Sequence, residues 1–202
     1  MKKNKTKGKL IVFYGINNLG KTTQAKMLVD YLNSKKLSSE YLKYPIYDLK
    51  PSGEYINEIL RGGKNQKISE EEFQMWYTIN RFQYEPLLKN KLSQGKIIIA
   101  EDYIGSGLAW GAAKKADLKW LEEINSKLLK EDLGILFNGE RFIAGKELKH
   151  IHEQNDDLMS CSRKTHLQLA KKYHWPIINA NQSIKDVHKN ILKIMSEKLG
   201  LF

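Results

Sequence analysis

The sequence reads Gly15-Ile16-Asn17-Asn18-Leu19-Gly20-Lys21-Thr22 near its N-terminus, which matches G-x-x-x-x-G-K-[ST] at every fixed position. A short apolar run, Leu10 to Tyr14, precedes this stretch, and apolar residues at helical spacing follow it. A strand before the loop and a helix after it are the context in which this pattern cradles phosphate, so a chance match on a glycine turn is disfavoured. The stretch predicts binding of a nucleoside triphosphate, although ATPases, GTPases and kinases all share it.

Each residue type in this loop has a chemical reason. Gly15 and Gly20 let the backbone turn sharply, so that its N–H groups and the helix N-terminus face an anion. We expect Lys21 to place its charge on the β- and γ-phosphates and the Thr22 hydroxyl to bind Mg²⁺. The complete set of expected ATP-binding residues is Gly15, Asn18, Gly20, Lys21, Thr22 and Thr23.

Two carboxylates follow the most apolar strand candidate in the chain, Ile97 to Ala100. Enzymes with this phosphate loop need a carboxylate at the end of a neighbouring strand to hold Mg²⁺ or its waters. Glu101 comes directly after the run and is our first choice for the metal, for accepting a proton from the attacking group, or for both. Asp102 is the competing metal ligand, and a pair of strand-end carboxylates facing water is the alternative interpretation.

Strand and helix patterns alternate along the rest of the chain. This alternation predicts an α/β fold in which a parallel central sheet is flanked by helices, the three-layer fold of P-loop NTPases. We expect one domain over residues 1–202, with a basic tail at 1–8 and a mobile lid at about 138–157. The expected strands are 9–14, 40–44, 97–100, 133–137 and 176–179. We expect a helix from Gly20 onward and helical patterns from about 108 to 129. The other expected helices are 54–61, 69–92 with a bend near Pro86, 158–173 and 183–199.

The composition excludes several classes of protein. The chain has 202 residues, 41% of them hydrophobic, and no apolar run approaches the ~20 residues of a membrane span. Cys161 is the only cysteine, which excludes an intrachain disulfide and a cysteine-only metal site. The net charge of +11 suits polyanions, but many lysines crowd the N-terminal tail or spread along helix faces. We expect a cytoplasmic protein with no specific nucleic-acid partner and no membrane partner.

Segments along nearly the whole chain resemble the thymidylate kinase family. The phosphate loop resembles that family's F-E-G-x-[DE]-x-x-G-K-[ST]-T-Q loop, and the segment after the strand at 97–100 resembles its D-R-Y-x-x-S-x-x-A-[YF] segment. The other matches are individually weak and jointly persuasive. The resembling segments are Phe13–Gln24, Tyr44-Pro45 with Gly53, Tyr77–Arg81, Glu101–Trp110, Asp132–Phe137 and Ala180–Ser183.

This resemblance implies transfer of phosphate from ATP, with Mg²⁺, to a small nucleotide acceptor, with dTMP giving dTDP, in a homodimeric enzyme. It implies that Tyr77 stacks on the acceptor base and that Arg81 hydrogen-bonds the base edge. The remaining implied acceptor residues are Asn17, Pro45, Tyr103 and Trp110. Apart from the resemblance, the aromatic residues would more often belong to the core and Arg81 would be a surface residue.

The chain departs from the family where the acceptor's phosphate is expected. The family's D-R pair is Glu101-Asp102 here, so the arginine of that pair is lost. The family's loop often carries an arginine directly after the proline, whereas Ile46 and Tyr47 follow Pro45 in this chain. Lys43, Lys50 or Arg61 are the candidate substitutes. The alternative is that the acceptor carries no phosphate and is a deoxynucleoside. Glu101 would then be the base that accepts a proton from a sugar hydroxyl. The third hypothesis, motivated by the net charge, is a regulatory or nucleic-acid-binding P-loop module that binds ATP without transferring phosphate.

The expected lid carries several cations. Kinases close such a segment over the phosphates to exclude water. Arg141 and Arg163 are the candidates for stabilising transition-state charge, and a solvated basic loop is the alternative. The segment also holds Lys146, Lys149, His150 and His152. A metal site at the two histidines with Glu153 is disfavoured because no further ligand cluster completes it.

Overall fold

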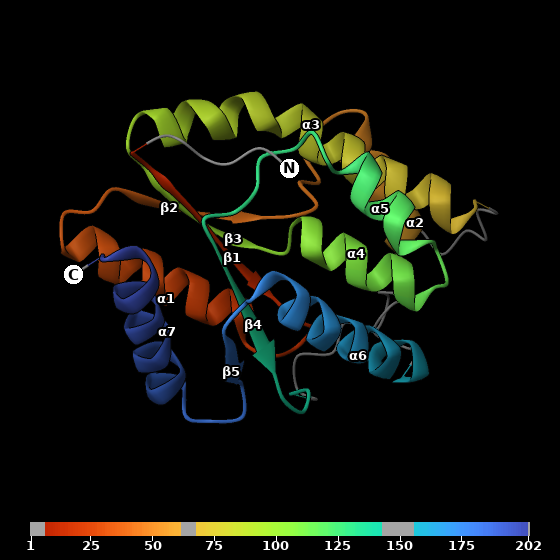
Figure 1. Ribbon diagram of the computed structural model, residues 1–202. Coiled ribbons are helices and arrows are strands. Elements are labelled where there is room, and N and C mark those ends of the chain that lie inside the picture. The colour runs from red at the N-terminus through yellow and green to blue at the C-terminus, as the bar shows by residue number, and fades with distance from the viewer. Residues whose placement is uncertain (1–6, 62–67, 143–155, 202) are drawn as a thin grey trace.

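The computed structural model describes residues 7–61, 68–142 and 156–201, and its strands form one parallel sheet with the order β2-β3-β1-β4-β5 (Figure 1). Strands and helices alternate along the chain, as the sequence predicts. The elements are β1 Lys9–Tyr14, α1 Lys21–Ser34, β2 Ser39–Lys43, α2 Ser52–Arg61, α3 Glu70–Ser93, β3 Ile97–Glu101, α4 Ile104–Ala113, α5 Leu118–Ile124, β4 Leu133–Asn138, α6 Asp156–Tyr173, β5 Ile177–Asn179 and α7 Ile184–Leu199.

Helices cover both faces of the sheet, which confirms the predicted three-layer α/β arrangement. Side chains alternate between the faces of a strand, so Leu10 and Val12 of β1 point one way and Ile11 and Phe13 the other. The first pair packs in a cluster with residues of α3, α4 and α6, and the second pair packs with α1 and α7 (Figure 1). Both clusters are buried, which explains why the central strands read as continuous apolar runs.

The register of the sheet places the functional segments at one edge. Phe13 of β1 pairs with Glu101 of β3, which in turn pairs with Lys43 of β2. All three residues lie at the carboxyl ends of parallel strands, and the phosphate loop begins two residues after Phe13. Ligands of open α/β sheets bind outside these strand ends, so the topology itself selects this edge.

Several predicted boundaries are wrong. The helical patterns expected from about 108 to 129 correspond to two helices, of which α4 begins earlier, at Ile104, and α5 ends earlier, at Ile124. The two are separate because Lys115 adopts a left-handed φ of 73° and Asp117 caps a new helix by accepting from Trp120 N at 2.8 Å. The expected lid overlaps regular structure at both ends, since Asn138 belongs to β4 and α6 begins at Asp156.

Other local expectations have mixed outcomes. Ser69 caps α3 by accepting from Glu72 N at 3.1 Å, as its sequence predicts. The same helix continues through Pro86 as far as Ser93. Within the expected basic tail at 1–8, the Gly8 N–H donates to the Leu92 carbonyl at 3.0 Å, and residues 1–6 lie outside the described residues.

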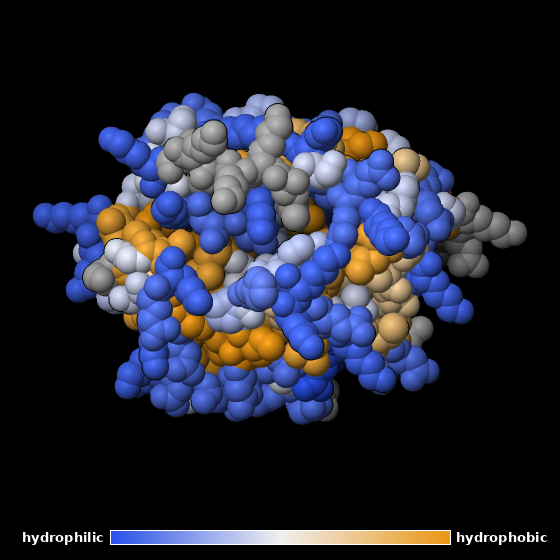
Figure 2. All heavy atoms as spheres, viewed as in Figure 1, coloured by the Kyte–Doolittle hydropathy of each residue, from blue (hydrophilic) through white to orange (hydrophobic). Residues whose placement is uncertain are grey.

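The surface is largely hydrophilic on the face seen in Figure 2, in keeping with the high content of charged residues. Helix α3 is an exception, because four of its apolar side chains are 39–47% exposed: Met75, Ile79, Phe82 and Leu87. Within the described residues, no helix combines the length and the apolar character needed to cross a membrane.

Candidate active site

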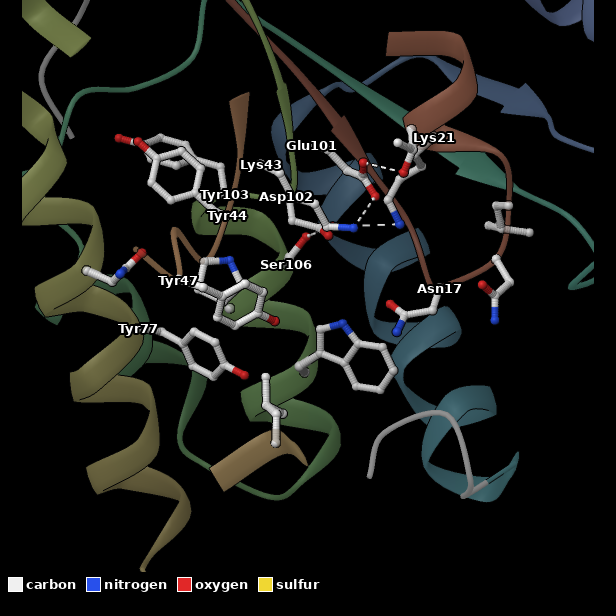
Figure 3. A pocket seen from close by; sticks show the side chains of 18 of the residues that line it. Asn17, Lys21, Lys43, Tyr44, Tyr47, Tyr77, Glu101, Asp102, Tyr103 and Ser106 are labelled. Carbon is white, nitrogen blue, oxygen red and sulfur yellow. Dashed lines mark hydrogen bonds and ion pairs between the residues drawn. The ribbon is translucent and has the colours of Figure 1, made fainter. Parts of the chain in front are cut away.

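A pocket of about 340 Å³ opens at the carboxyl edge of the sheet and joins the phosphate loop to the space between α3 and α4 (Figure 3). It brings together most of the residues that the sequence analysis singled out. The predicted site residues among its lining are Asn17, Asn18, Gly20, Lys21, Thr22, Thr23, Pro45, Tyr77, Arg81, Glu101, Asp102, Tyr103 and Trp110.

The phosphate loop needs its first glycine for two reasons. Gly15 has a φ of 130°, which L side chains rarely adopt, and a Cβ there would lie 2.5 Å from the Phe137 carbonyl oxygen. Gly20 has a left-handed φ of 78° immediately before α1 begins at Lys21. The backbone therefore enters the N-terminus of α1 through a tight turn, which is the geometry that presents N–H groups to phosphate.

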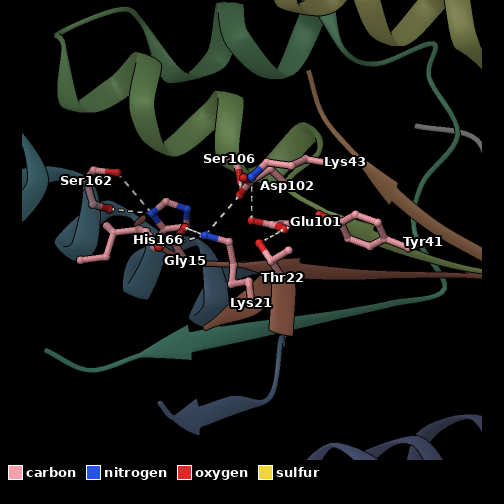
Figure 4. A network of polar contacts seen from close by, with 11 residues as sticks. Gly15, Lys21, Thr22, Tyr41, Lys43, Glu101, Asp102, Ser106, Ser162 and His166 are labelled. Atoms are coloured by element: carbon pink, nitrogen blue, oxygen red, sulfur yellow. Dashed lines mark hydrogen bonds and ion pairs between the residues drawn. The ribbon is translucent and has the colours of Figure 1, made fainter. Parts of the chain in front are cut away.

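The Lys21 side chain is held inside this loop. Its ammonium donates to the Gly15 and Ile16 carbonyls at 2.8 and 2.9 Å, and it lies 3.7 Å from Asp102 Oδ1 (Figure 4). Only 3% of the residue is exposed. A buried ammonium fixed in this way is a preorganised positive charge at the phosphate loop.

Glu101 is the centre of a polar network at the end of β3. Its Oε2 accepts from the Thr22 hydroxyl and from the Tyr41 hydroxyl, both at 2.6 Å, and its Oε1 lies 3.3 Å from Lys43 Nζ (Figure 4). Burial alone would raise the pKa of this carboxyl, but the Lys21 and Lys43 charges and the two hydroxyl donors hold the pKa below its usual range. Glu101 is therefore an ionised carboxylate that accepts a hydrogen bond from the Thr22 hydroxyl.

Asp102 has a different environment although it is the next residue. Its φ of 59° is left-handed, and its Oδ1 accepts from the Ser106 hydroxyl at 2.7 Å. Burial, together with the Glu101 charge, raises the pKa of this carboxyl in spite of the nearby lysines. Of the two competing carboxylates, Glu101 is the more strongly ionised and the one that contacts Thr22.

Two residues of this network had no signal in the sequence. Tyr41 lies on the edge strand β2, two residues before Lys43, so both side chains reach Glu101 from the same face (Figure 4). His166 of α6 is 1% exposed, its Nδ1 lies 2.9 Å from the Ser162 carbonyl, and burial lowers its pKa to about 4. A single tyrosine on a strand and a single histidine on a helix become recognisable only when the fold brings them to the loop.

Aromatic rings form the wall of the pocket away from the phosphate loop. Tyr103 packs against Tyr44 with ring centroids 5.0 Å apart, and its hydroxyl donates to the Leu129 carbonyl at 3.1 Å. Tyr77 of α3 is half-buried and points across the pocket, and Trp110 of α4 is 8% exposed (Figure 3). Aromatic rings beside the polar residues of this pocket suit contact with a flat heterocycle.

Arg81 is buried in this wall, which excludes its interpretation as a surface residue. It is 4% exposed, and its Nη1 donates to Asn125 Oδ1 at 2.9 Å. Its guanidinium lies against Gly107, where a Cβ would come within 2.6 Å of Nη2. The glycine in α4 thus makes room for a donor-only group that faces the pocket.

The three candidate substitutes for the missing arginine differ in position. Lys43 and Arg61 line the pocket, whereas Lys50 forms an exposed ion pair with Glu54 at 2.8 Å and is not part of the lining. The Arg61 guanidinium lies over the Tyr47 ring at 4.7 Å. Lys43 is the candidate nearest to the carboxylates, and its side chain is 48% exposed.

The two predicted lid arginines do not reach the pocket in the described part of the chain. Arg141 pairs with Asp156 at 3.2 Å, and Arg163 donates to Asn138 Oδ1 at 2.8 Å. Phe142, which the sequence analysis did not single out, lines the pocket, and its N–H donates to the Asn18 carbonyl at 2.9 Å. The other predicted lid cations lie outside the described residues: Lys146, Lys149, His150 and His152.

Among residues 7–61, 68–142 and 156–201, no three His, Cys, Asp or Glu side chains are arranged to hold a metal by themselves. A Mg²⁺ ion bound here would need phosphate oxygens in addition to protein oxygens, which is the usual arrangement for Mg²⁺ with nucleotides. The hydroxyl of Thr22 and the carboxylate of Glu101 are hard oxygen donors at 2.6 Å from each other and fit this requirement.

Comparisons with known proteins agree with this geometry. The family model of thymidylate kinase matches residues 13–191. The chain is 30% identical to a probable thymidylate kinase of Thermococcus onnurineus over 94% of this chain and 98% of that protein, and 29% identical to the thymidylate kinase of Homo sapiens over 95% and 91%. A solved structure of the thymidylate kinase from Candida albicans superposes with a TM-score of 0.82 at 25% identity, covering 94% of this chain and 92% of that one. The resemblance in the sequence is thus confirmed: the chain belongs to the thymidylate kinase family of ATP-dependent nucleotide kinases.

Proposed function

We propose that this enzyme transfers the γ-phosphate of ATP to the 5′-phosphate of dTMP, giving dTDP and ADP. The observation that carries this proposal is the single pocket in which a phosphate loop and an aromatic slot face each other across Glu101. In the reaction, a phosphate oxygen of dTMP forms the new bond to the γ-phosphorus. The bond from that phosphorus to the β–γ bridging oxygen breaks, and ADP leaves.

The donor half of the pocket would bind ATP. The backbone N–H groups between Gly15 and Thr23 and the ammonium of Lys21 would hold the phosphates. Mg²⁺, when bound, supplies positive charge between the phosphate groups and helps to align them for in-line transfer. Thr22 and Glu101 are the residues that would hold it, and Tyr41 would fix the orientation of the carboxylate through its 2.6 Å hydrogen bond.

The acceptor half would bind the base between Tyr77, Tyr103 and Trp110, with the Arg81 guanidinium at the base edge. Lys43 is the pocket cation best placed to replace the missing family arginine. Its ammonium lies beside Glu101, and half of the side chain is exposed, so a short rotation would carry it to an acceptor phosphate. Arg141 and Arg163 would stabilise transition-state charge if they turned from Asp156 and Asn138 towards the phosphates.

A deoxyribonucleoside acceptor is the second candidate function, favoured by one observation. The position of the family's phosphate-binding arginine carries Asp102, which supplies no positive charge to an acceptor phosphate. With a nucleoside acceptor, a sugar hydroxyl would attack instead, and Glu101 would accept its proton because its pKa keeps it ionised.

We also propose that the enzyme is a homodimer associated through α3. Met75, Ile79 and Phe82 recur at helical spacing along this helix and are 39–45% exposed. An exposed apolar stripe on one helix is typical of a protein interface. Analytical ultracentrifugation of the protein and of Ile79→Lys tests this, with a dimer expected for the first and a monomer for the second. A monomeric unmodified protein at micromolar concentration would refute the proposal.

The phosphotransfer proposal is tested by measuring ADP release with ATP and Mg²⁺ in the presence of dTMP, thymidine, or no acceptor. Turnover with dTMP and not with thymidine supports the proposed reaction. Turnover with thymidine alone assigns the deoxynucleoside kinase function. ATP binding without any acceptor-dependent turnover refutes both and favours the non-catalytic module.

A further inference from the structure

Gln74 is a buried polar residue at the α3–α4 end of the pocket, and neither the P-loop nor the family segments include it. It is 1% exposed and lines the pocket. Its Nε2 donates to Glu70 Oε1 at 2.7 Å, and Glu70 Oε2 accepts from Lys114 at 2.9 Å. Because an ionised carboxylate only accepts hydrogen bonds, the amide atom that faces Glu70 must be the nitrogen. The orientation of the Gln74 amide is therefore fixed, and its oxygen is the atom left over.

That oxygen has no hydrogen-bond partner among the described residues, although it is fully buried. Buried polar atoms are nearly always paired, and because Gln74 lines the pocket, a ligand bound there could supply the partner of this oxygen. The Arg81 Nε–H lies on the same helix and is also buried without a hydrogen-bond partner among the described residues. It is a donor, whereas the Gln74 oxygen is an acceptor. Besides the Tyr44 hydroxyl, which is also buried and unpaired among the described residues, the pocket lining thus includes an unused acceptor at Gln74 and an unused donor at Arg81.

The packing of α3 on α4 places these two groups close together. A Cβ at Gly107 would approach the Arg81 guanidinium, and a Cβ at Gly111 would lie 3.2 Å from Gln74 Cδ. Gly107 and Gly111 are one turn apart on α4, a rise of about 6 Å. Two such groups can contact neighbouring atoms on one edge of a planar base, because each hydrogen bond spans about 3 Å.

The two groups define which base edge fits. Arginine can only donate, and the fixed Gln74 oxygen can only accept. Their complement is a carbonyl next to a ring N–H, which thymine and uracil present as O4 and N3–H. Cytosine presents the reverse, an amino group next to a bare ring nitrogen. We infer that Gln74 is a specificity-determining residue that accepts a hydrogen bond from the base N3–H and so excludes cytosine. This inference rests on the proposed function, in which the acceptor is a nucleotide.

The test is a binding cycle with dTMP and N3-methyl-dTMP, using isothermal titration calorimetry on the unmodified protein and on Gln74→Met. Methylation removes the N3–H donor, and methionine removes the acceptor at similar volume. We expect N3-methyl-dTMP to bind the unmodified protein about 10- to 100-fold more weakly than dTMP, with dCMP weakened similarly. In Gln74→Met the penalty for methylation should fall below about threefold. The matched control is Gln94→Met, an exposed glutamine at the C-terminus of α3, which should keep the full penalty.

An equal methylation penalty in both proteins overturns the inference, as does equal binding of dTMP and dCMP to the unmodified protein, a comparison that needs no variant. Thermal unfolding of Gln74→Met checks that the variant is folded. The readout is separate from catalysis: binding that depends on N3–H without dTMP turnover refutes only the proposed phosphotransfer. Turnover of dTMP with an unchanged methylation penalty refutes only the role of Gln74.

Discussion

The two ends of the pocket are built in different ways. The phosphate end comes from one contiguous segment, Gly15 to Thr23, whose groups bond one another: Lys21 donates to two carbonyls of its own loop. The acceptor end is assembled from the loop after β2, from α3 and from α4. Its buried polar groups are incompletely paired, as the Arg81 Nε–H and the Gln74 oxygen show.

This difference separates the two parts of the reaction. A loop that satisfies itself is rigid before ATP arrives, which suits a step that depends on preorganised charge. The unpaired donor and acceptor at the acceptor end can select between bases. The correct base forms hydrogen bonds with both groups, whereas a wrong base leaves them buried and unpaired. Changes at the phosphate end should therefore lower kcat for every acceptor, and changes at the acceptor end should alter KM for particular acceptors.

The largest effect is expected from Lys21→Met. This change removes the preorganised charge at the phosphate loop, and kcat should fall by about 10²- to 10³-fold with dTMP. Steady-state ADP release measures it, and Lys35→Met at the exposed end of α1 is the matched control. A Lys21→Met enzyme with kcat within threefold of the unmodified enzyme would remove Lys21 from the proposed mechanism.

A smaller effect should distinguish the two adjacent carboxylates. Glu101→Gln removes the charge that contacts Thr22, and we expect kcat to fall about 100-fold and the Mg²⁺ requirement to rise. Asp102→Asn keeps the hydrogen bond from Ser106 and should lower kcat less than tenfold, because burial already disfavours the charge of Asp102. Titrating Mg²⁺ at saturating ATP compares the two, and a larger loss in Asp102→Asn would reverse the assignment.

The same contrast explains how far the sequence alone could predict this molecule. Apolar runs and glycines in the sequence predicted β1, the phosphate loop and α1. These three elements could be predicted because their geometry depends on residues close to one another in the chain. The end of β3 placed Glu101 correctly, since parallel strands end at one edge of the sheet. Tyr41 and Gln74 carried no signal in the sequence. Glu101, the partner of Tyr41, lies 60 residues away along the chain, and the packing of Gln74 against Gly111 joins two different helices, α3 and α4.

The helical patterns over 108–129 did not locate the break between α4 and α5, for a local reason that periodicity could not show. Apolar residues continue across the break between α4 and α5, and the stop depends on the left-handed φ of Lys115, a residue type with no preference for it. Asp117 before the second helix was the available signal, because aspartate is a strong N-cap. The roles assigned to Arg141 and Arg163 stay predictions.

At the acceptor end, Lys43→Met should raise KM for dTMP by about tenfold, because the lost contact is one charge-assisted hydrogen bond to phosphate. The KM for ATP should change less than twofold if Lys43 serves the acceptor alone. Lys50→Met is the matched control, since Lys50 is an exposed lysine in the same loop region outside the pocket. An unchanged KM for dTMP in Lys43→Met would assign the acceptor phosphate to another cation, with Arg61 the next candidate.

The smallest effect concerns stability and comes from His166, the buried ring beside Lys21 (Figure 4). Burial lowers its pKa to about 4, whereas a histidine in an unfolded chain titrates near ~6.5. Between these values the unfolded chain binds the extra proton, so the stabilisation is complete above about pH 6.5 and is lost as the pH falls towards 4. His166→Gln removes this dependence. When the pH is lowered from 7 to 5, the free energy of unfolding of the unmodified protein should fall by about 2 kcal/mol more than that of His166→Gln. Urea denaturation at the two pH values measures both.

Two features make this difference specific to His166. Every other titrating group, Glu101 and Asp102 included, is common to both proteins and cancels in the comparison. His188→Gln provides a graded control, because His188 is only half-buried and burial lowers its pKa as well. Its effect should be smaller than that of His166→Gln. Equal pH slopes for the unmodified protein and His166→Gln would mean that the ring has the same pKa in the folded and the unfolded chain. The ring would then take up a proton between pH 7 and pH 5 in the folded protein, and the phosphate end would gain a second positive charge beside Lys21 instead of resting on a neutral ring.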